Sequence, residues 1–226
     1  FVYQNCREIL NEDGTKAEYT EKATSDAIKF YVNLQNNDWC PTQEQFANTS
    51  ATEQFFSGQG AMFFAGSWDL ANLCSTYTDM NGKWDVAVLP KCPNPESGDG
   101  RAVISNSVSY ATAAEGKNKD TAMDFLKFLA SEEGQRIQGE SGVAIPAYNG
   151  LEDTWVNTFA ENGYDIHPEN IIPMFDYSVK YVNNPSRPSW EPKVEQAVLD
   201  IYAGNMSVDD GIQNMQDIVT EAIAEE

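Results

Sequence analysis

The sequence contains a single histidine, His167, among its 226 residues. Nucleophilic catalysis by serine or cysteine uses an imidazole as the base, so these enzyme classes would depend here on one residue. His167 lies in a polar stretch before Pro168, which favours a surface or helix-capping role. No GxxxxGKS or GxGxxG pattern is present, so no phosphate-binding loop is indicated. We therefore expect no catalytic residue and no enzymatic activity.

Basic residues are also scarce. The chain has 14 Lys and Arg against 35 Asp and Glu, which gives a net charge of −21. Such a surface repels phosphate backbones and anionic lipid headgroups, so we expect no nucleic-acid partner and no electrostatic membrane docking. Long apolar runs are missing as well, which excludes a membrane-spanning helix of about 20 residues. The charge leaves cationic ligands open.

Cysteine pairs with metal-site spacing are lacking. The four cysteines are Cys6, Cys40, Cys74 and Cys92. None forms a CxxC pair, and with one histidine in the chain a zinc site would need mostly cysteine ligands at unusual spacing. We therefore expect no metal and no cofactor. Free buried thiols and one or two disulfides in an exported protein both remain open.

Carboxylates are abundant, which keeps a glycan hydrolase with two acidic catalytic residues as an alternative. However, the acidic pairs Glu132-Glu133 and Asp209-Asp210 fall where helices are expected to begin. Negative side chains are favoured there by the helix dipole. Helix-start electrostatics is the simpler interpretation of both pairs.

Hydrophobic periodicity predicts an α/β protein in which helices alternate with short buried strands. Helices are expected at residues 20–35, 51–56, 68–73, 119–130, 132–138, 151–159, 194–204 and 207–219. Strands are expected at residues 61–65, 85–89, 103–104 and 108–112. Residues 171–182 are partly periodic.

Two of the five tryptophans stand out by their positions. Trp155 lies on an apolar helical stripe and is expected in the core. Trp68 and Trp190 each stand where a Gly- or Pro-containing turn meets the beginning of a helix. A ring there can face a cleft, and the apolar C–H face of a sugar packs well on such a surface. Core packing is the alternative for both side chains.

One motif and its downstream order carry a family resemblance. Residues 55–68 read FFSGQGAMFFAGSW, and residues 86–90 (VAVLP), 122–129 (AMDFLKFL), 142–146 (GVAIP) and 204–210 (GNMSVDD) follow, with Trp190 before the last of these. Over most of the chain and in this order, the sequence resembles the bacterial extracellular solute-binding proteins of sugar ABC importers, of the maltose-binding-protein-like family 1. It resembles their C-terminal portion.

The resemblance implies a type II periplasmic-binding-protein fold, a Venus flytrap of two α/β lobes. Residues 1–86 and 146–226 would belong to the C-terminal lobe, and residues 87–145 would cross to the N-terminal lobe. Most of the N-terminal lobe would precede Phe1. For the 226-residue chain alone we therefore expect weak or absent sugar binding.

The resemblance also implies a function. The protein would bind a sugar or oligosaccharide by hinge closure and deliver it to the membrane subunits of an ABC permease. It would act as a monomer outside the cytoplasm, either in the periplasm or as a surface lipoprotein, although no cysteine here lies in a lipid-anchor context. The same fold could instead bind a polyamine, a peptide or a metal chelate.

The same resemblance implies a set of ligand-binding residues. Trp68 and Trp190 would stack on sugar rings, and Gly66, Ser67 and Asp69 would lie near the sugar hydroxyls. Asn106 and Ser107 match the strand region that leads toward the other lobe and complete the expected site.

Overall fold

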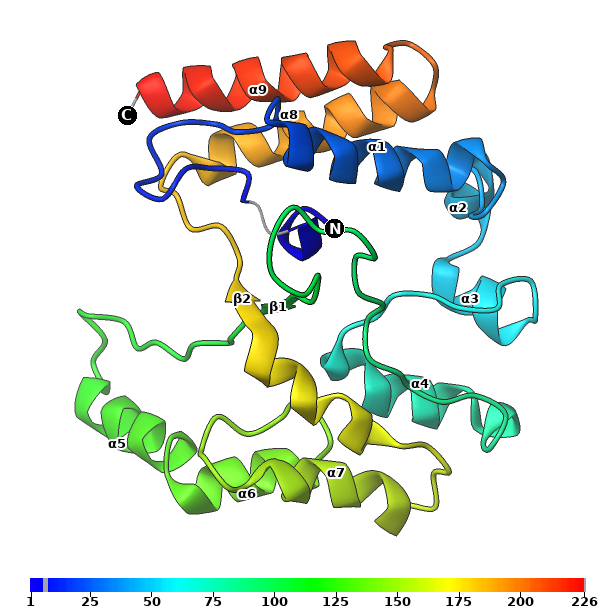
Figure 1. Ribbon diagram of the computed structural model, residues 1–226. Coiled ribbons are helices and arrows are strands. Elements are labelled where there is room, and N and C mark those ends of the chain that lie inside the picture. Colours follow the sequence, from blue (N-terminus) through cyan, green and yellow to red (C-terminus); the bar gives the residue numbers. More distant parts are fainter. Residues whose placement is uncertain (6–7, 226) are drawn as a thin grey trace. The chain divides into compact units, whose positions relative to one another are not determined.

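The computed structural model describes residues 1–5 and 8–225 (Figure 1). The chain divides into two compact units, each built from separate stretches of sequence. The first unit comprises Phe1–Ser50, Leu89–Asn106 and Tyr177–Glu226, and the second comprises Ala51–Val88 and Ser107–Asp176. These ranges differ from the expected 1–86, 87–145 and 146–226, so the assignment of residues to lobes stays a prediction. In the described part of the chain, no helix has the length and hydrophobicity needed to cross a membrane.

Helices are the main regular elements of the first unit. They are the 3-10 helix η1 (Tyr3–Asn5) and the α-helices α1 (Lys22–Asn36), α2 (Gln43–Asn48), α8 (Arg187–Tyr202) and α9 (Val208–Ala224). Helices α1, α8 and α9 pack on one another (Figure 1). Two of these helices begin with side-chain caps. Ser207 Oγ accepts from the backbone N–H of Asp210 at 3.1 Å, and Thr42 begins α2 with a capping box. Such caps satisfy N–H groups that have no partner within the helix.

The core of the first unit lies between these helices. Its buried members are Leu10, Ala17, Tyr19, Val32, Trp190, Ala197, Ile201, Ile212, Met215, Val219 and Ala222. The spacing of Ile212, Met215 and Val219 gives α9 one apolar face, as the sequence predicts. Gly211 lets α9 approach α8 closely, because a Cβ atom there would lie 2.4 Å from Ile201 Cδ1.

The sheet of the described residues has two strands, both in the first unit. Strands β1 (Val103–Ser105) and β2 (Ser178–Lys180) are parallel, with Val103 opposite Ser178. The expected strand at residues 103–104 is therefore confirmed. The partly periodic residues 171–182 are helical only in their first part. The 3-10 helix η5 (Ile172–Tyr177) ends at Tyr177, and strand β2 follows it.

The second unit is also mainly helical. It contains α3 (Ala51–Phe56), η2 (Ser67–Asp69), α4 (Leu70–Thr76), η3 (Thr78–Met80), α5 (Lys119–Leu129), α6 (Glu132–Glu140), α7 (Glu152–Glu161) and η4 (Pro168–Asn170), and nearly all of η5. Its buried core consists of Leu70, Cys74, Trp155, Phe159 and Ile166. The expectation for Trp155 is confirmed, since its side chain is fully buried and its Nε1–H donates to Gly142 O at 3.0 Å.

The prediction of three further strands is wrong, because these segments pair with no other strand of the described residues. Residues 61–65, 85–89 and 108–112 have no regular secondary structure, and none of them pairs in a sheet of the described residues. A strand needs a neighbour to satisfy its backbone groups, and hydrophobic composition alone does not supply one. The run 61–65 is not buried either, because Met62 is 88% and Phe64 62% exposed.

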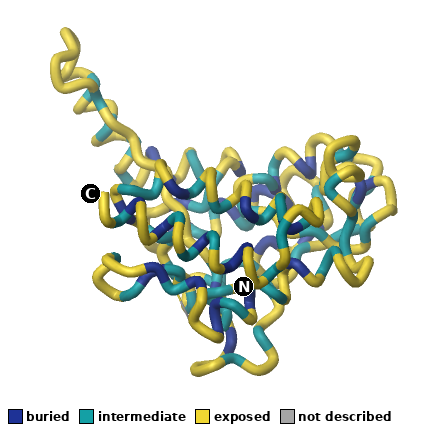
Figure 2. The backbone as a smooth tube through the Cα atoms, turned by 90° about the horizontal axis from the view of Figure 1, so that it is seen from above, coloured by how far each residue is buried: buried dark blue, intermediate teal, exposed yellow. Residues whose placement is uncertain are grey.

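Helix α5 agrees with the helix expected at residues 119–130, but its apolar stripe is not buried. Its apolar residues share a stripe, yet none of its residues is buried, and Phe125 is 59% exposed. Figure 2 shows how buried residues alternate with exposed ones along the chain. The periodicity thus predicts the helix, whereas burial depends on a partner that the described residues do not provide.

Three of the four cysteines lie within the described residues. Cys40, Cys74 and Cys92 are free thiols, and Cys6 lies outside the described residues. Burial raises the pKa of the Cys74 thiol to about 11, so it stays protonated at neutral pH. Within residues 1–5 and 8–225, no group of three or more His, Cys, Asp and Glu side chains could hold a metal ion.

Candidate ligand-binding site

The turn at residues 66–69, called here the Trp68 turn, holds four of the predicted site residues. Two hydrogen bonds close it. The backbone N–H of Gly66 donates to Asp69 Oδ2 at 3.3 Å, and the backbone N–H of Asp69 donates to Gly66 O at 3.0 Å. Helix α4 follows directly and buries Leu70, Leu73 and Cys74. The turn is therefore anchored by its own hydrogen bonds and by the helix behind it.

The Trp68 side chain lies outside the core of the second unit. It is 59% exposed, while Leu70 two residues later is 3% exposed. An indole of this size at the surface leaves a large apolar area in water, which a ligand can cover. Asp69 has one carboxylate oxygen engaged by Gly66, so that oxygen serves the turn itself.

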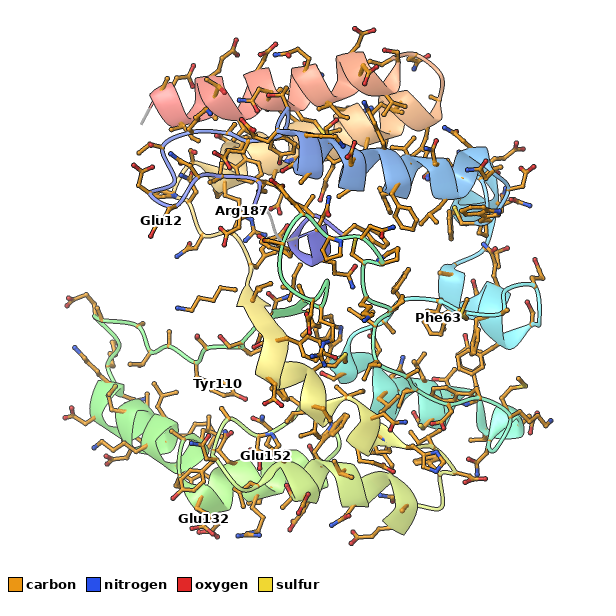
Figure 3. The ribbon with its side chains drawn as sticks, viewed as in Figure 1. Glu12, Phe63, Tyr110, Glu132, Glu152 and Arg187 are labelled. Carbon is orange, nitrogen blue, oxygen red and sulfur yellow. The ribbon has the colours of Figure 1, made fainter. Side chains whose placement is uncertain are left out.

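Aromatic packing supports the extended segment that leads into the Trp68 turn. Phe56 stacks on Tyr77 with ring centroids 3.9 Å apart and meets Trp84 edge-on at 5.3 Å. Phe63 packs against Phe55 at 5.0 Å and lies in the connection between α3 and α4 (Figure 3). The rings hold this segment in place although it has no strand partner.

The sequence alone does not predict this supporting cluster. The alternation around Phe63 was the available signal, since Met62 and Phe64 on either side of it are exposed. Alternation of this kind is typical of a segment with one packed and one open face. The run is therefore a largely exposed segment in which only Phe63 is partly buried, and it is not a buried strand.

Trp190 lies in a different environment. Its side chain is 2% exposed within the core of the first unit, and its Nε1–H has no hydrogen-bond partner among the described residues. The structure therefore places this indole in the core of the first unit, as the core-packing alternative has it. A contact of Trp190 with a sugar ring stays a prediction.

The beginning of α8, around Trp190, is held by a polar network. Arg187 forms an ion pair with Glu191 at 2.9 Å, and the Tyr181 hydroxyl donates to Glu191 Oε1 at 2.7 Å. The Arg187 guanidinium also lies 4.0 Å from the centre of the Tyr181 ring (Figure 3). Partial burial, followed by the bond to Glu191, raises the pKa of Tyr181 to about 12. The Tyr181 hydroxyl therefore stays protonated to a higher pH than that of an ordinary tyrosine.

The remaining predicted residues, Asn106 and Ser107, follow β1 directly and are exposed. Asn106 ends a stretch of the first unit and Ser107 begins a stretch of the second. The structure thus brings Gly66, Ser67, Trp68 and Asp69 together in one turn. The grouping of this turn with Asn106, Ser107 and Trp190 stays a prediction.

The single histidine links two loops of the second unit. His167 Nδ1 lies 2.6 Å from Asp85 Oδ2, and the His167 backbone N–H donates to Asp85 Oδ1 at 2.8 Å. The hydrogen bond and the charge of Asp85 raise the pKa of His167. Partial burial opposes ionisation of Asp85, but the hydrogen bonds from His167 and Val86 outweigh it and lower the pKa of that carboxyl. The expected surface role of His167 is confirmed, and its partner is Asp85.

An acidic hollow of about 580 Å³ lies in the first unit. Its lining residues are Tyr3, Glu8, Leu10, Asn11, Glu12, Glu18 and Val179. Three carboxylates make the hollow unfavourable for anions. Glu12 is labelled in Figure 3.

Comparison with known proteins shows the family of this chain. The model of a family described as bacterial extracellular solute-binding protein matches residues 7–136. Among curated proteins, no sequence matches.

Solved structures give the fold. The chain is similar to an ABC substrate-binding protein of Listeria monocytogenes in complex with cycloalternan, with a TM-score of 0.80 and 16% identity over 99% of this chain and 55% of that chain. It is similar to the sugar-binding protein MalE of Xanthomonas citri, with a TM-score of 0.76 and 18% identity over 100% of this chain and 55% of that chain.

A third similar structure is an ABC transporter solute-binding protein of Thermotoga lettingae bound with alpha-D-tagatose. Its TM-score is 0.71, with 18% identity over 99% of this chain and 55% of that chain. The chain therefore spans about 55% of the length of these three structures. Its fold is that of the type II periplasmic binding proteins, as expected.

Proposed function

We propose, because the chain belongs to the bacterial extracellular solute-binding protein family, that the full-length protein is the sugar-binding component of an ABC importer. It captures a sugar or oligosaccharide outside the cytoplasm and delivers it to the membrane permease. The full-length protein works as a monomer, held in the periplasm or at the cell surface by a lipid anchor. No covalent bond of the sugar is made or broken.

One observation carries this proposal: a large indole lies at the surface on a turn that two hydrogen bonds close. Trp68 is 59% exposed, while Gly66 and Asp69 close the turn around it. The C–H face of a neutral sugar covers such a ring without desolvating any charge, so stacking costs little and removes apolar surface from water. Polar groups near the turn, together with Asn106 and Ser107, supply partners for the sugar hydroxyls.

The proposed mechanism is closure around the bound sugar. Sugar binding shifts the population of the receptor toward a closed form, by as much as its contacts with that form exceed those with the open form. Two of the similar structures were solved with a cyclic oligosaccharide and a ketohexose, cycloalternan and tagatose. These sugars are the first ligands to test.

A thermal-shift screen of the full-length protein tests the proposal. The panel contains tagatose, cycloalternan and maltotriose, with spermidine as the cationic alternative suggested by the acidic hollow. A ligand that binds only the native state raises Tm, by an amount equivalent to about 2.7 kcal/mol at a hundred times its Kd. We expect a rise with at least one sugar and none with spermidine. The reverse pattern would favour a polyamine receptor.

A second assay addresses the glycan-hydrolase alternative. The full-length protein is incubated with a fluorescently labelled form of the sugar that raises Tm, and the products are separated by chromatography. We expect the labelled sugar to be recovered intact after many hours. Shortened products, absent with a heat-denatured control, would show turnover and contradict the receptor proposal.

A further inference from the structure

The backbone conformation at position 66 does not require a glycine. Its φ of −96° and ψ of 156° lie in the extended region that any residue adopts. The reason for a glycine at this position therefore has to be space and not backbone conformation.

The space at Gly66 is occupied by the Trp68 ring. A Cβ atom added to Gly66 would lie 2.3 Å from both Cε2 and Cζ2 of Trp68 and 2.5 Å from Cη2. These are three consecutive atoms of the six-membered ring, and nearly equal distances to them place the added atom over the ring face and not beside its edge. Real Cβ atoms essentially never approach heavy atoms closer than 3.0 Å. The indole therefore lies with one face against the Gly66 backbone.

This contact is held from both ends. Gly66 is fixed by its N–H bond to Asp69, and Trp68 precedes the buried start of α4. With one face of its six-membered ring covered by Gly66, a side chain that is 59% exposed has its opposite face available to solvent. A platform with one covered and one open face accepts one ring of a ligand.

We infer that Gly66 is a positioning residue, which lets the Trp68 ring rest on its backbone and so directs the open ring face toward a single sugar ring. This inference rests on the proposed function. It changes the expected role of Gly66 from a neighbour of the sugar hydroxyls to a support of the aromatic platform.

A matched control lies six residues earlier. Gly60 belongs to the same extended connection, but a Cβ atom there would meet nothing closer than 3.8 Å, in ordinary contact with Phe55. Gly60→Ala therefore adds the same methyl group as Gly66→Ala without reaching Trp68. Any effect shared by the two variants comes from the loss of a glycine and not from the ring.

The first test measures the environment of the Trp68 ring directly. Full-length protein labelled with 5-fluorotryptophan is studied by fluorine NMR, and the Trp68→Phe variant identifies the Trp68 resonance. Gly66→Ala should shift that resonance, because the methyl group displaces the ring, and Gly60→Ala should leave it in place. An unchanged Trp68 resonance in Gly66→Ala would overturn the inference, whatever the protein binds.

The second test reads sugar affinity in a double-mutant cycle. Alone, Gly66→Ala should weaken binding by roughly two- to tenfold, the effect of holding a ring off its preferred rotamer. In the Trp68→Ala background the same substitution should not weaken sugar binding further, because no ring remains to displace. Equal losses in both backgrounds would contradict a positioning role. If Gly66→Ala fails to fold, the double variant should fold again, and failure of both would contradict the inference.

The two tests separate this inference from the proposed function. A wild-type protein that binds no sugar in the panel refutes the sugar-receptor proposal, and the fluorine resonance then still reports whether Gly66 positions the ring. A protein that binds sugar with an unmoved resonance in Gly66→Ala keeps the receptor function and refutes only the role of Gly66.

Discussion

Trp68 in the second unit and Trp190 in the first unit occupy similar places in the sequence and opposite environments in the structure. Each follows a turn and stands at or near the beginning of a helix, yet Trp68 is 59% exposed and Trp190 is 2% exposed. The local pattern of turn and helix start therefore does not decide whether an aromatic side chain faces a ligand. What decides this is the position of the aromatic residue relative to the apolar stripe of the following helix.

The stripe of each helix explains the difference. Trp190 precedes Val194, Ala197 and Ile201 at intervals of four, three and four residues, which places all of them on one face of α8. This face packs into the core of the first unit. By contrast, Trp68 stands two residues before Leu70, out of phase with the buried stripe of α4. Residues two apart do not share a helix face.

The largest expected effect separates the two tryptophans by stability. Trp190→Ala should lower the free energy of unfolding by about 3–5 kcal/mol, because it empties a large volume in the core. Urea unfolding monitored by circular dichroism measures this loss. Trp190→Phe is the control, since it keeps much of the volume and removes an Nε1–H that has no partner among the described residues. If Trp190→Ala were as stable as the wild type, Trp190 would not differ from Trp68 in its contribution to the core.

A second effect tests the close packing of α8 and α9 around Trp190. Gly211→Ala should cost about 1–3 kcal/mol of stability, because the added methyl group would collide with Ile201 in a filled core. At an open helix position the same change stabilises a protein by about 1 kcal/mol. Gln213→Ala, at an exposed position of α9, is the control in the same urea assay. A more stable Gly211→Ala variant would refute the close approach of the two helices.

A smaller, pH-dependent effect is expected in the second unit at His167. Its raised pKa gives stability that is present below the ordinary value of 6.5 and is lost as the pH rises through the raised value. The lowered pKa of Asp85 gives stability that is present above 3.8 and is lost as the pH falls. His167→Ala should therefore lower Tm more at about pH 5.5 than at about pH 9.

His167→Gln is the control for this prediction, because glutamine keeps a hydrogen-bond donor for Asp85 without a titrating charge. Its Tm should exceed that of His167→Ala by a similar amount at both pH values, because neither variant carries the imidazolium charge and the two differ only in the hydrogen bond. Equal losses at both pH values for His167→Ala would show that the ion pair with Asp85 contributes no stability.

The smallest expected effect on stability is at Trp68. Trp68→Ala should change the free energy of unfolding by no more than about 0.5 kcal/mol, as is usual for surface substitutions. The urea assay used for Trp190→Ala measures it directly. A loss as large as that of Trp190→Ala would show that Trp68 belongs to the core, and the contrast between the two side chains would disappear.

The sequence predicted most of the helices, because their apolar residues recur at helical spacing and caps mark their beginnings. Ser207 before α9 and the stripe of Ile212, Met215 and Val219 are examples, and both occur in the structure. It did not predict α2, and it began α8 at residue 194 and not at Arg187. The strands were predicted poorly. Residues 61–65 are apolar enough for a buried strand, but pairing depends on a partner that composition does not specify.

The candidate site was predicted in part. Its residue types pointed to the Trp68 turn, and the structure shows an exposed indole there. The supporting role of Gly66 was not visible in the sequence, because it depends on a contact between side chain and backbone in space. The burial of Trp190 was visible in principle, since its phase with Val194 and Ala197 already marks the buried face of α8.

Isothermal titration of the full-length Trp68→Ala variant tests the central claim most directly. With the sugar that raises Tm of the wild-type protein, the Kd should increase by roughly 5- to 150-fold, which corresponds to about 1–3 kcal/mol for a buried aromatic contact. The unfolding free energy of the same preparation should stay near that of the wild type. A Kd equal to the wild-type value would contradict the account, because it would show that the sugar does not contact the Trp68 ring.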